Sequence, residues 1–372
     1  MIRNLAAVFA LAIGGVAQTP APDGLTSPEV KSDRTVTFRV RAPKAGEAML
    51  YGDWMPVGKG QAMAKGADGV WSLTTDPLEA NVHLYWFNID GVAVADPINP
   101  VIKLRQRTSA SLVEVPADSP ALWDVQDVPH GTVVTEWRKS PVLGRTERIM
   151  IYLPPGYEGS AARYPILYLV HGSGDVPESW TQAGHANLIL DNLIAAKRAK
   201  PMIVVMPAGH AVLFSAPRNG AVSNNDLFEK YLTGEVIPYV ESKYRVQKGA
   251  QSRALAGLSM GGGHTIYTGF DHPELFSVLG IFSPGLPRDF DAKFGSVLAQ
   301  PEAFNKQVRT VWVACGDADL TVQYPRVKSW EESLEKAGIH STFKTYAGAH
   351  TWPVWRLSLA DFAPLLFGTS QN

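Results

Sequence analysis

The chain of 372 residues contains 34 Lys and Arg against 35 Asp and Glu, and 45% of its residues are hydrophobic. This composition excludes a disordered chain, and the near-zero net charge gives no electrostatic footprint for nucleic acid or an anionic membrane. At about 100 to 200 residues per domain, the length predicts two domains.

The N-terminus has the pattern of a signal peptide. A basic tetrapeptide is followed by an apolar run from Leu5 to Ile13 and by small residues from Gly14 to Ala17. The run is shorter than the roughly 20 residues that span a bilayer, so we expect residues 1–17 to be a signal peptide. We therefore expect export to the periplasm or the medium, without a membrane anchor. The alternative interpretation of the apolar run is a buried N-terminal helix. Cys315 is the only cysteine, so no intrachain disulfide can form.

Residues 25–117 have the pattern of a small all-β sandwich. Within Arg34–Val40, the side chains of Val36, Phe38 and Val40 share one face of an alternating strand. Further short runs follow at Ala48–Tyr51, Val70–Leu73, His83–Phe87 and Ala110–Val113. The dipeptides Asp68-Gly69 and Asp90-Gly91 are typical of the hairpin turns that join such strands.

Residues 120–370 show apolar strand-length runs alternating with helix-length segments. This alternation predicts a mostly parallel sheet covered by helices on both faces, the α/β class. The expected strands are Ile149–Leu153, Pro165–Val170, Met202–Met206, Arg253–Ala256, Val278–Phe282 and Val308–Ala314. The expected helices are Ala186–Ala196, Leu227–Lys243, Gly262–Phe270 and Gln323–Ala337. We expect the domain boundary between about Asp118 and Val128.

The run Gly257-Leu258-Ser259-Met260-Gly261 matches the G-x-S-x-G nucleophile elbow of α/β-hydrolases. It follows an expected strand and opens an expected helix, which is the context that this motif requires. The tight turn needs small residues on both sides of the serine, which it exposes at the edge of the sheet. The sequence therefore predicts Ser259 as a nucleophile.

A serine hydroxyl needs an adjacent base, and histidine suits that task near neutral pH. Because α/β-hydrolases run in the order serine, acid, histidine, the candidates are those that follow Ser259 in the chain. His350 lies in a loop after an expected strand, Thr342–Tyr346, where the catalytic histidine is expected, although a surface-loop histidine is the alternative. The other downstream histidines are in or beside helices: His264, His272 and His340.

The acid is expected where the strand before the last helix ends, and two carboxylates are available there, Asp317 and Asp319. A carboxylate fixes the tautomer of the imidazole and stabilises the imidazolium. We favour Asp319, while Asp317 is suited to capping the following turn.

Two backbone amides should bind the oxyanion of the tetrahedral intermediate. Met260 follows the nucleophile and supplies the first. The loop His171-Gly172-Ser173-Gly174 follows an apolar strand and resembles an H-G-G-G oxyanion loop, so we expect the Ser173 amide to be the second. His171 is interpreted as a structural residue rather than a second base.

These motifs resemble the feruloyl esterases of carbohydrate esterase family 1, the esterase D-like α/β-hydrolases. The resemblance covers roughly residues 120–368 and depends on four segments: Val128–Gly131, Leu169–Gly172 with Ala186-Asn187, Gly257–Gly262, and Gly348–Trp352. In this family the acid stands three residues after the glycine of an Ala-Cys-Gly strand end, which implies Asp319 here.

Residues 25–117 look like a family-48 carbohydrate-binding or early-set module, with Gly52-Asp53-Trp54 after a strand and Asp96–Pro100 near the end. Trp54, Trp71 and Trp86 are candidates for stacking on sugar rings, but aromatic residues in a small sandwich more often form its core. We therefore expect no particular ligand for this module, which instead shapes the rim of the active site.

The resemblance implies a serine esterase that releases ferulate from plant cell-wall polysaccharide such as feruloylated arabinoxylan, or that acts on another aromatic ester. Trp352, Trp355 and Gly172 are the candidate substrate-binding residues, with packing as the alternative role of the two tryptophans. Other open functions are acetyl xylan esterase, enterochelin-type siderophore esterase, mycolyl-type acyl transfer, and a carbohydrate-binding scaffold with an inactive esterase domain. No cofactor is expected, and no H-E-x-x-H run indicates a metal site.

Overall fold

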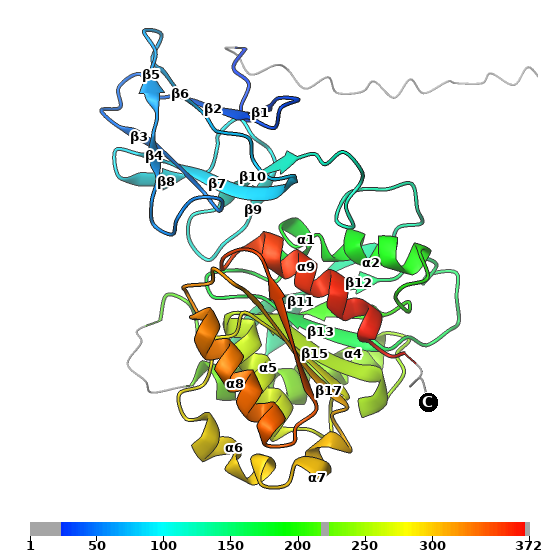
Figure 1. The fold of residues 1–372 in the computed structure, drawn as a ribbon. Coiled ribbons are helices and arrows are strands. Elements are labelled where there is room, and N and C mark those ends of the chain that lie inside the picture. Colours follow the sequence, from blue (N-terminus) through cyan, green and yellow to red (C-terminus); the bar gives the residue numbers. More distant parts are fainter. Residues whose placement is uncertain (1–23, 217–222, 369–372) are drawn as a thin grey trace, which may run out of the picture.

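The computed structural model describes residues 24–216 and 223–368, and it contains an N-terminal β-sandwich and a C-terminal α/β sheet (Figure 1). The predicted signal peptide, residues 1–17, lies outside the described residues. Within the described residues, no helix is both long enough and apolar enough to cross a membrane.

The sandwich is built from two antiparallel sheets. One sheet has the order β1 (Glu29–Val30), β2 (Val36–Arg41), β6 (Val70–Thr74) and β5 (Ala64–Lys65). The other has the order β4 (Gln61–Ala62), β3 (Ala48–Gly52), β7 (Asn81–Ile89), β10 (Ala110–Val115) and β9 (Ile102–Lys103), with β8 (Val92–Val94) paired to β7. The expected alternation holds, because Val36, Phe38 and Val40 are all buried in the core between the sheets.

The three tryptophans of the sandwich have packing partners. Trp71 is buried, and the ring of Trp54 stacks on Phe38 with 5.7 Å between ring centroids. Trp86 stacks on Tyr51 at 5.3 Å, and the guanidinium of Arg105 lies 5.9 Å from the centroid of the Trp86 ring. These contacts favour the interpretation of all three as packing residues.

The C-terminal sheet has eight strands in the order β11-β12-β14-β13-β15-β16-β17-β18. Only β11 and β12 run antiparallel to their neighbours, and all later pairs are parallel. This is the strand order of the α/β-hydrolase fold, as predicted. The bounds are β11 (Thr132–Ser140), β12 (Arg145–Leu153), β13 (Ile166–Val170), β14 (Ile203–Met206), β15 (Arg253–Leu258), β16 (Val278–Phe282), β17 (Thr310–Gly316) and β18 (Ser341–Tyr346).

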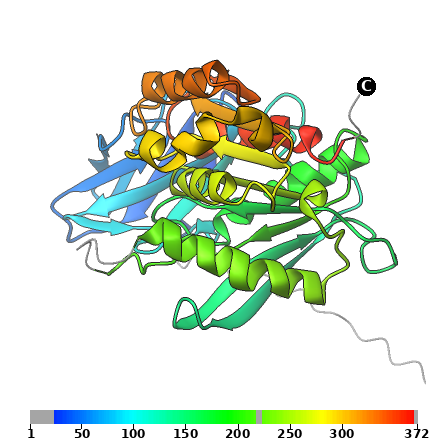
Figure 2. The ribbon, with the colours of Figure 1, turned by 90° about the horizontal axis from the view of Figure 1, so that it is seen from below.

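Helices cover both faces of this sheet (Figures 1 and 2). One face packs against α1 (Ser179–Gln182), α2 (Ala186–Ala195) and α9 (Trp352–Phe362). The other packs against α3 (Asn224–Tyr231), α4 (Ile237–Lys243), α5 (Met260–Asp271), α6 (Phe290–Leu298), α7 (Pro301–Asn305) and α8 (Tyr324–Lys336). Single turns of other helix types are a π-helical turn at Leu232–Val236 and 3-10 turns at Ala250–Ser252 and Ala363–Leu365.

The structure differs from the sequence-based expectations in several segments, and two of these differences have a local cause. The expected helix Leu227–Lys243 contains a π-helical turn between α3 and α4, where Gly234 interrupts the helical pattern. The strand β11 was not expected, because most of its residues are exposed at the edge of the sheet and its sequence, TVVTEWRKS, is largely polar.

Besides the core of the sandwich itself, one hydrophobic cluster is shared between the sandwich and the α/β sheet. Val82 of β7 and Leu112 of β10 belong to the same buried cluster as α2 and α9. The side chain of Arg356 in α9 is fully buried at this contact, where its guanidinium donates to the carbonyl oxygens of Ala183 and Val82 and to the amide oxygen of Asn81. The sandwich is therefore fixed against the face of the sheet that α9 covers.

Candidate active site

Ser259 stands in a sharp turn between β15 and α5. Its backbone angles are φ 52° and ψ −111°, a conformation that an L-residue adopts only under strain. The turn is possible because both flanking glycines lack a Cβ: one added at Gly257 would lie 2.5 Å from the Gly261 carbonyl, and one at Gly261 would lie 2.4 Å from the Val170 oxygen. The predicted elbow is thus present, with Ser259 at the carboxyl edge of the sheet.

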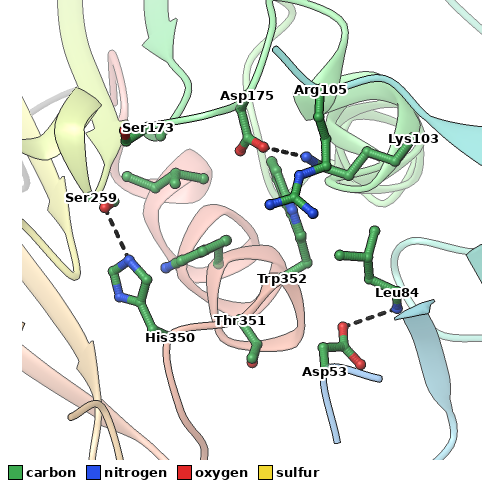
Figure 3. Close-up of a pocket in the computed structure, with 13 residues that line it drawn as sticks. Asp53, Leu84, Lys103, Arg105, Ser173, Asp175, Ser259, His350, Thr351 and Trp352 are labelled. Atoms are coloured by element: carbon green, nitrogen blue, oxygen red, sulfur yellow. Dashed lines mark hydrogen bonds and ion pairs between the residues drawn. The ribbon is translucent and has the colours of Figure 1, made fainter. Parts of the chain in front are cut away.

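His350 follows β18 and reaches back to the elbow. Its Nε2 lies 3.0 Å from the Oγ of Ser259, within hydrogen-bond distance (Figure 3). The edge of the Trp355 ring faces the imidazole, with 5.0 Å between centroids, and fixes the plane of the histidine from the first turns of α9. This geometry allows the imidazole to take the proton of the serine hydroxyl.

Asp319 completes a chain of hydrogen bonds. Its Oδ2 lies 2.7 Å from Nδ1 of His350, and its Oδ1 accepts hydrogen bonds from the backbone amides of Thr321 and Val322. Burial disfavours the carboxylate, but the bond to His350, the imidazole charge and the Val322 amide outweigh this and lower the pKa of Asp319. The ionised acid is therefore the form that meets the imidazole.

The alternative acid, Asp317, has a different role. Its Oδ1 accepts a hydrogen bond of 3.0 Å from the amide of Gly348, so its carboxylate closes the turn that precedes His350. The side chain is exposed, whereas Asp319 is 1% exposed. The geometry thus supports the preference for Asp319 that the sequence suggested.

The remaining candidate histidines lie away from the serine hydroxyl. His264 is buried beside Asn225 and the carbonyl of Gly209, and burial lowers its pKa to about 3. His171 is also buried: its Nε2 accepts from the amide of Gly209 and its Nδ1 donates to the Gly172 oxygen. Burial lowers the pKa of His171 to about 4, so it is a neutral residue that shapes the loop.

The loop His171–Asp175 passes directly beside the nucleophile. A Cβ added at Gly172 would lie 3.4 Å from the Cβ of Ser259 and 2.6 Å from a methyl group of Leu258, so a larger residue would have to displace the Leu258 side chain. Ser173 is exposed toward the pocket (Figure 3). Met260 is the first residue of α5, so its N–H has no acceptor within the helix. Both predicted amide donors thus lie at the mouth of the elbow.

The pocket in front of Ser259 has a volume of about 170 Å³ and is lined by both regions of the molecule (Figure 3). The predicted substrate-binding residues Gly172, Trp352 and Trp355 all line it. Both tryptophans are also largely buried, and Trp352 packs edge-on against Trp180 at 5.3 Å, so they are packing and lining residues at once. The other lining residues are Asp53, Leu84, Lys103, Arg105, Ser173, Asp175, Leu258, Ser259, His350 and Thr351.

Four of these lining residues belong to the sandwich, and none of them was predicted as a site residue, although the module was expected to shape the rim of the active site: Asp53, Leu84, Lys103 and Arg105. Only Leu84 and Lys103 lie in strands, and strand alternation does not predict which other part of the molecule covers their side chains. Their place in the pocket depends on how the sandwich packs against α9.

Three of the charged residues that line the pocket are paired: Asp53 with His83, and Lys103 with Asp175. Both ring nitrogens of His83 face acceptors, the Asp53 carboxylate at 3.0 Å and the Glu79 carbonyl at 2.9 Å. Burial opposes the imidazolium, but the bond to Asp53 and its charge outweigh it and raise the pKa of His83. Lys103 forms a buried ion pair with Asp175. Across residues 24–216 and 223–368, no group of three or more His, Cys, Asp or Glu side chains could hold a metal ion.

The chain is similar to esterases in sequence. A family model described as "Esterase: Putative esterase" matches residues 140–366. The endo-1,4-beta-xylanase/feruloyl esterase of Xylanibacter ruminicola is 33% identical over 353 residues, which are 92% of this chain and 46% of that protein. An uncharacterised protein of Corynebacterium glutamicum is 26% identical over 56% of this chain and 54% of its own length. The chain thus spans about half the length of these relatives.

Solved structures give a consistent picture. The ferulic acid esterase of the anaerobic fungus Anaeromyces mucronatus is 25% identical, with a TM-score of 0.56, and the match covers 67% of this chain and 96% of that one. The enterobactin esterase of Shigella flexneri is 19% identical, with a TM-score of 0.67, and the match covers 94% and 99%. At that identity the second likeness concerns the fold alone, and it extends over the sandwich as well as the α/β sheet.

Proposed function

Because the chain belongs to the esterase family whose model matches residues 140–366, we propose that it is a serine carboxylic-ester hydrolase. Ser259 is the nucleophile, His350 the base and Asp319 the acid. The observation that carries this proposal is the chain of hydrogen bonds from Ser259 through His350 to Asp319 at the nucleophile elbow.

Each group has a defined role in the proposed reaction. His350 takes the proton of the Ser259 hydroxyl as the oxygen attacks the ester carbonyl, and Asp319 stabilises the imidazolium that forms. The amides of Met260 and Ser173 bind the oxyanion of the tetrahedral intermediate. The imidazolium then protonates the leaving alcohol, and water releases the acid from the acyl-enzyme through the same steps.

The proposed substrate is a hydroxycinnamate ester, in particular a feruloyl ester of plant cell-wall arabinoxylan. The identity of 33% with a xylanase/feruloyl esterase supports it. The pocket supports it as well, since a cavity of about 150 Å³ can hold a benzene ring and this one measures about 170 Å³. Leu84, Leu258 and Trp355 give part of the wall an apolar surface that suits an aromatic ring, the charged residues Asp53, Lys103, Arg105 and Asp175 line the rest, and Gly172 leaves room beside the nucleophile.

We also propose how the chain is organised and where it acts. Residues 25–117 form a carbohydrate-binding-like module of family 48, and residues 120–370 form the esterase domain. Residues 1–17 direct export, as their apolar run from Leu5 to Ile13 suggests. The enzyme would then meet polysaccharide in the periplasm or the medium.

The test is the release of acid from a panel of esters by the wild type and Ser259→Ala. The panel contains methyl ferulate, feruloylated arabinoxylan, p-nitrophenyl acetate, acetylated xylan and enterobactin. We expect ferulate release from the first two and its loss in the variant. Acetate release alone would keep the mechanism and move the substrate to acetyl esters. Cleavage of enterobactin alone would assign a siderophore ester, and activity that survives in Ser259→Ala would overturn the assignment of the nucleophile.

A further inference from the structure

The loop beside the nucleophile is held from outside by the sandwich. After β9, the chain of the sandwich runs alongside the loop that contains Ser173. The amide of Gln106 donates to the carbonyl of Gly174 at 2.8 Å, and its side-chain Nε2 donates to the carbonyl of Asp175 at 3.2 Å. Two carbonyls of one short loop are thus bound by a single residue that lies about 70 positions earlier in the sequence.

An ion pair joins the same two segments. The ammonium of Lys103 contacts Oδ1 of Asp175, and both residues are buried, with Lys103 only 1% exposed (Figure 3). The ammonium also lies 5.5 Å from the centroid of the Trp352 ring, on the helix that follows His350. A buried charge without its partner is strongly unfavourable, so this pair holds the loop and the sandwich in one arrangement.

The hydrolase side holds the loop at one further point. The amide of Gly174 donates to Nε2 of His210 at 2.9 Å. Ser173 therefore lies between two fixed residues: Gly172, packed against Ser259, and Gly174, which is bonded from both sides. The position of the Ser173 amide depends on all of these contacts.

We infer that Lys103 and Gln106 are positioning residues for ester hydrolysis, and that they act through Asp175 and Gly174 on the amide of Ser173. This inference rests on the proposed function, because it assigns that amide to the oxyanion. A preorganised donor stabilises the transition state without rearrangement, and a displacement of about 1 Å can lower a rate about 100-fold. The sandwich thereby takes part in the reaction without contacting the reacting atoms.

The experiment compares Lys103→Met with Lys65→Met. Lys65 is the control for loss of a sandwich lysine away from the loop: its ammonium also lies near an aromatic ring, Trp71 at 5.2 Å, and donates to a backbone carbonyl, but the residue is exposed. For each variant, kcat and KM are measured on methyl ferulate and on p-nitrophenyl acetate, and the rate at which a fluorophosphonate modifies Ser259 is measured by mass spectrometry.

We expect Lys103→Met to lower kcat about 10- to 100-fold on both esters, to slow phosphonylation similarly and to change KM less than about 3-fold. Lys65→Met should leave all values near those of the wild type. A rise of KM at unchanged kcat would overturn the inference, since Lys103 would then contact substrate. An unchanged kcat in Lys103→Met would also overturn the inference. The proposed function would still stand in that case, provided that hydrolysis by the wild type depends on Ser259.

Gln106→Ala provides a second route, because Gln106 is exposed and its loss leaves no buried charge. It removes one bond to Asp175, and we expect kcat to fall about 3- to 10-fold with thermal stability close to that of the wild type. This variant remains informative if Lys103→Met does not fold. A kcat of Gln106→Ala equal to that of the wild type would then overturn the inference.

Discussion

The two sides of the pocket are built differently. On one side, Ser259, Asp319 and His350 follow three strands of one sheet, β15, β17 and β18, and every contact within the triad lies inside the α/β region. On the other side, the Ser173 loop follows β13 but is bonded to residues of the sandwich. The contacts among Ser259, His350 and Asp319 are thus set by local strand ends, whereas the position of the Ser173 loop depends on the packing of two regions.

The largest expected effect tests the triad. His350→Gln removes the base, and we expect kcat to fall about 10⁵-fold or more. His340→Gln is the control, since His340 is an exposed histidine of the same region that lies before β18. Its kcat should equal that of the wild type. A comparable loss in both variants would mean that damage to the fold, rather than loss of the base, explains the result.

The second effect separates the two acids. Asp319→Asn removes the charge that faces Nδ1 of His350, and we expect kcat to fall about 10³- to 10⁴-fold with KM little changed. Asp317→Asn alters a carboxylate that only closes the turn at Gly348, and kcat should change less than about 3-fold. The opposite ranking of the two variants would assign the role of the acid to Asp317.

The third effect acts on the contact between the two regions. Arg356→Met removes the guanidinium that donates to the buried oxygens of Ala183, Val82 and Asn81, of which Asn81 keeps a hydrogen bond from the Val82 amide, so we expect the free energy of unfolding to fall by about 2 to 4 kcal/mol. Arg309→Met is the control, because Arg309 makes one hydrogen bond, to the Leu365 carbonyl, at a more exposed site. Urea denaturation provides the measurement, and equal losses in both variants would contradict this role of Arg356.

The smallest effect depends on pH and lies at the sandwich side of the pocket. Since its folded-state pKa is raised, the His83 imidazolium adds stability that is fully present below its unfolded pKa of 6.5 and is lost as pH rises through the folded-state value. The stability advantage of the wild type over His83→Gln should therefore shrink as pH rises. Asp53→Asn removes the partner and should remove this pH dependence. A constant difference across pH would contradict the charged pair.

The sequence predicted the arrangement of Ser259, Asp319 and His350 better than the contacts that hold the Ser173 loop. The G-x-S-x-G motif, the Ala-Cys-Gly strand end and the loop at His350 are local patterns, so strand order alone brings Ser259, Asp319 and His350 together. The role of Asp175 had no such pattern, because it depends on a lysine that is far away in the sequence and on the angle at which two regions meet.

The same distinction holds for the fold. Buried strands such as Val278–Phe282 were predicted with correct bounds, because the ends of a short apolar run mark the ends of a buried strand. The exposed edge strand β11 and the helix α9 were missed. In α9, the expected loop residues after His350 are helical, since Trp352, Val354, Trp355 and Leu359 are buried between the sheet and the sandwich. The helical conformation of α9 therefore depends on tertiary packing, which the local sequence does not show.

The shared core has a consequence for how such a chain evolves. Val82 and Leu112 of the sandwich are packed into the same cluster as α9, and Arg356 binds across the contact. A recombination event that removed the sandwich would expose this apolar surface and take away two of the three acceptors of the guanidinium, those of Asn81 and Val82, leaving only the Ala183 carbonyl. We therefore expect that the sandwich can be lost only together with substitutions that make this surface of α9 polar and give Arg356 other partners.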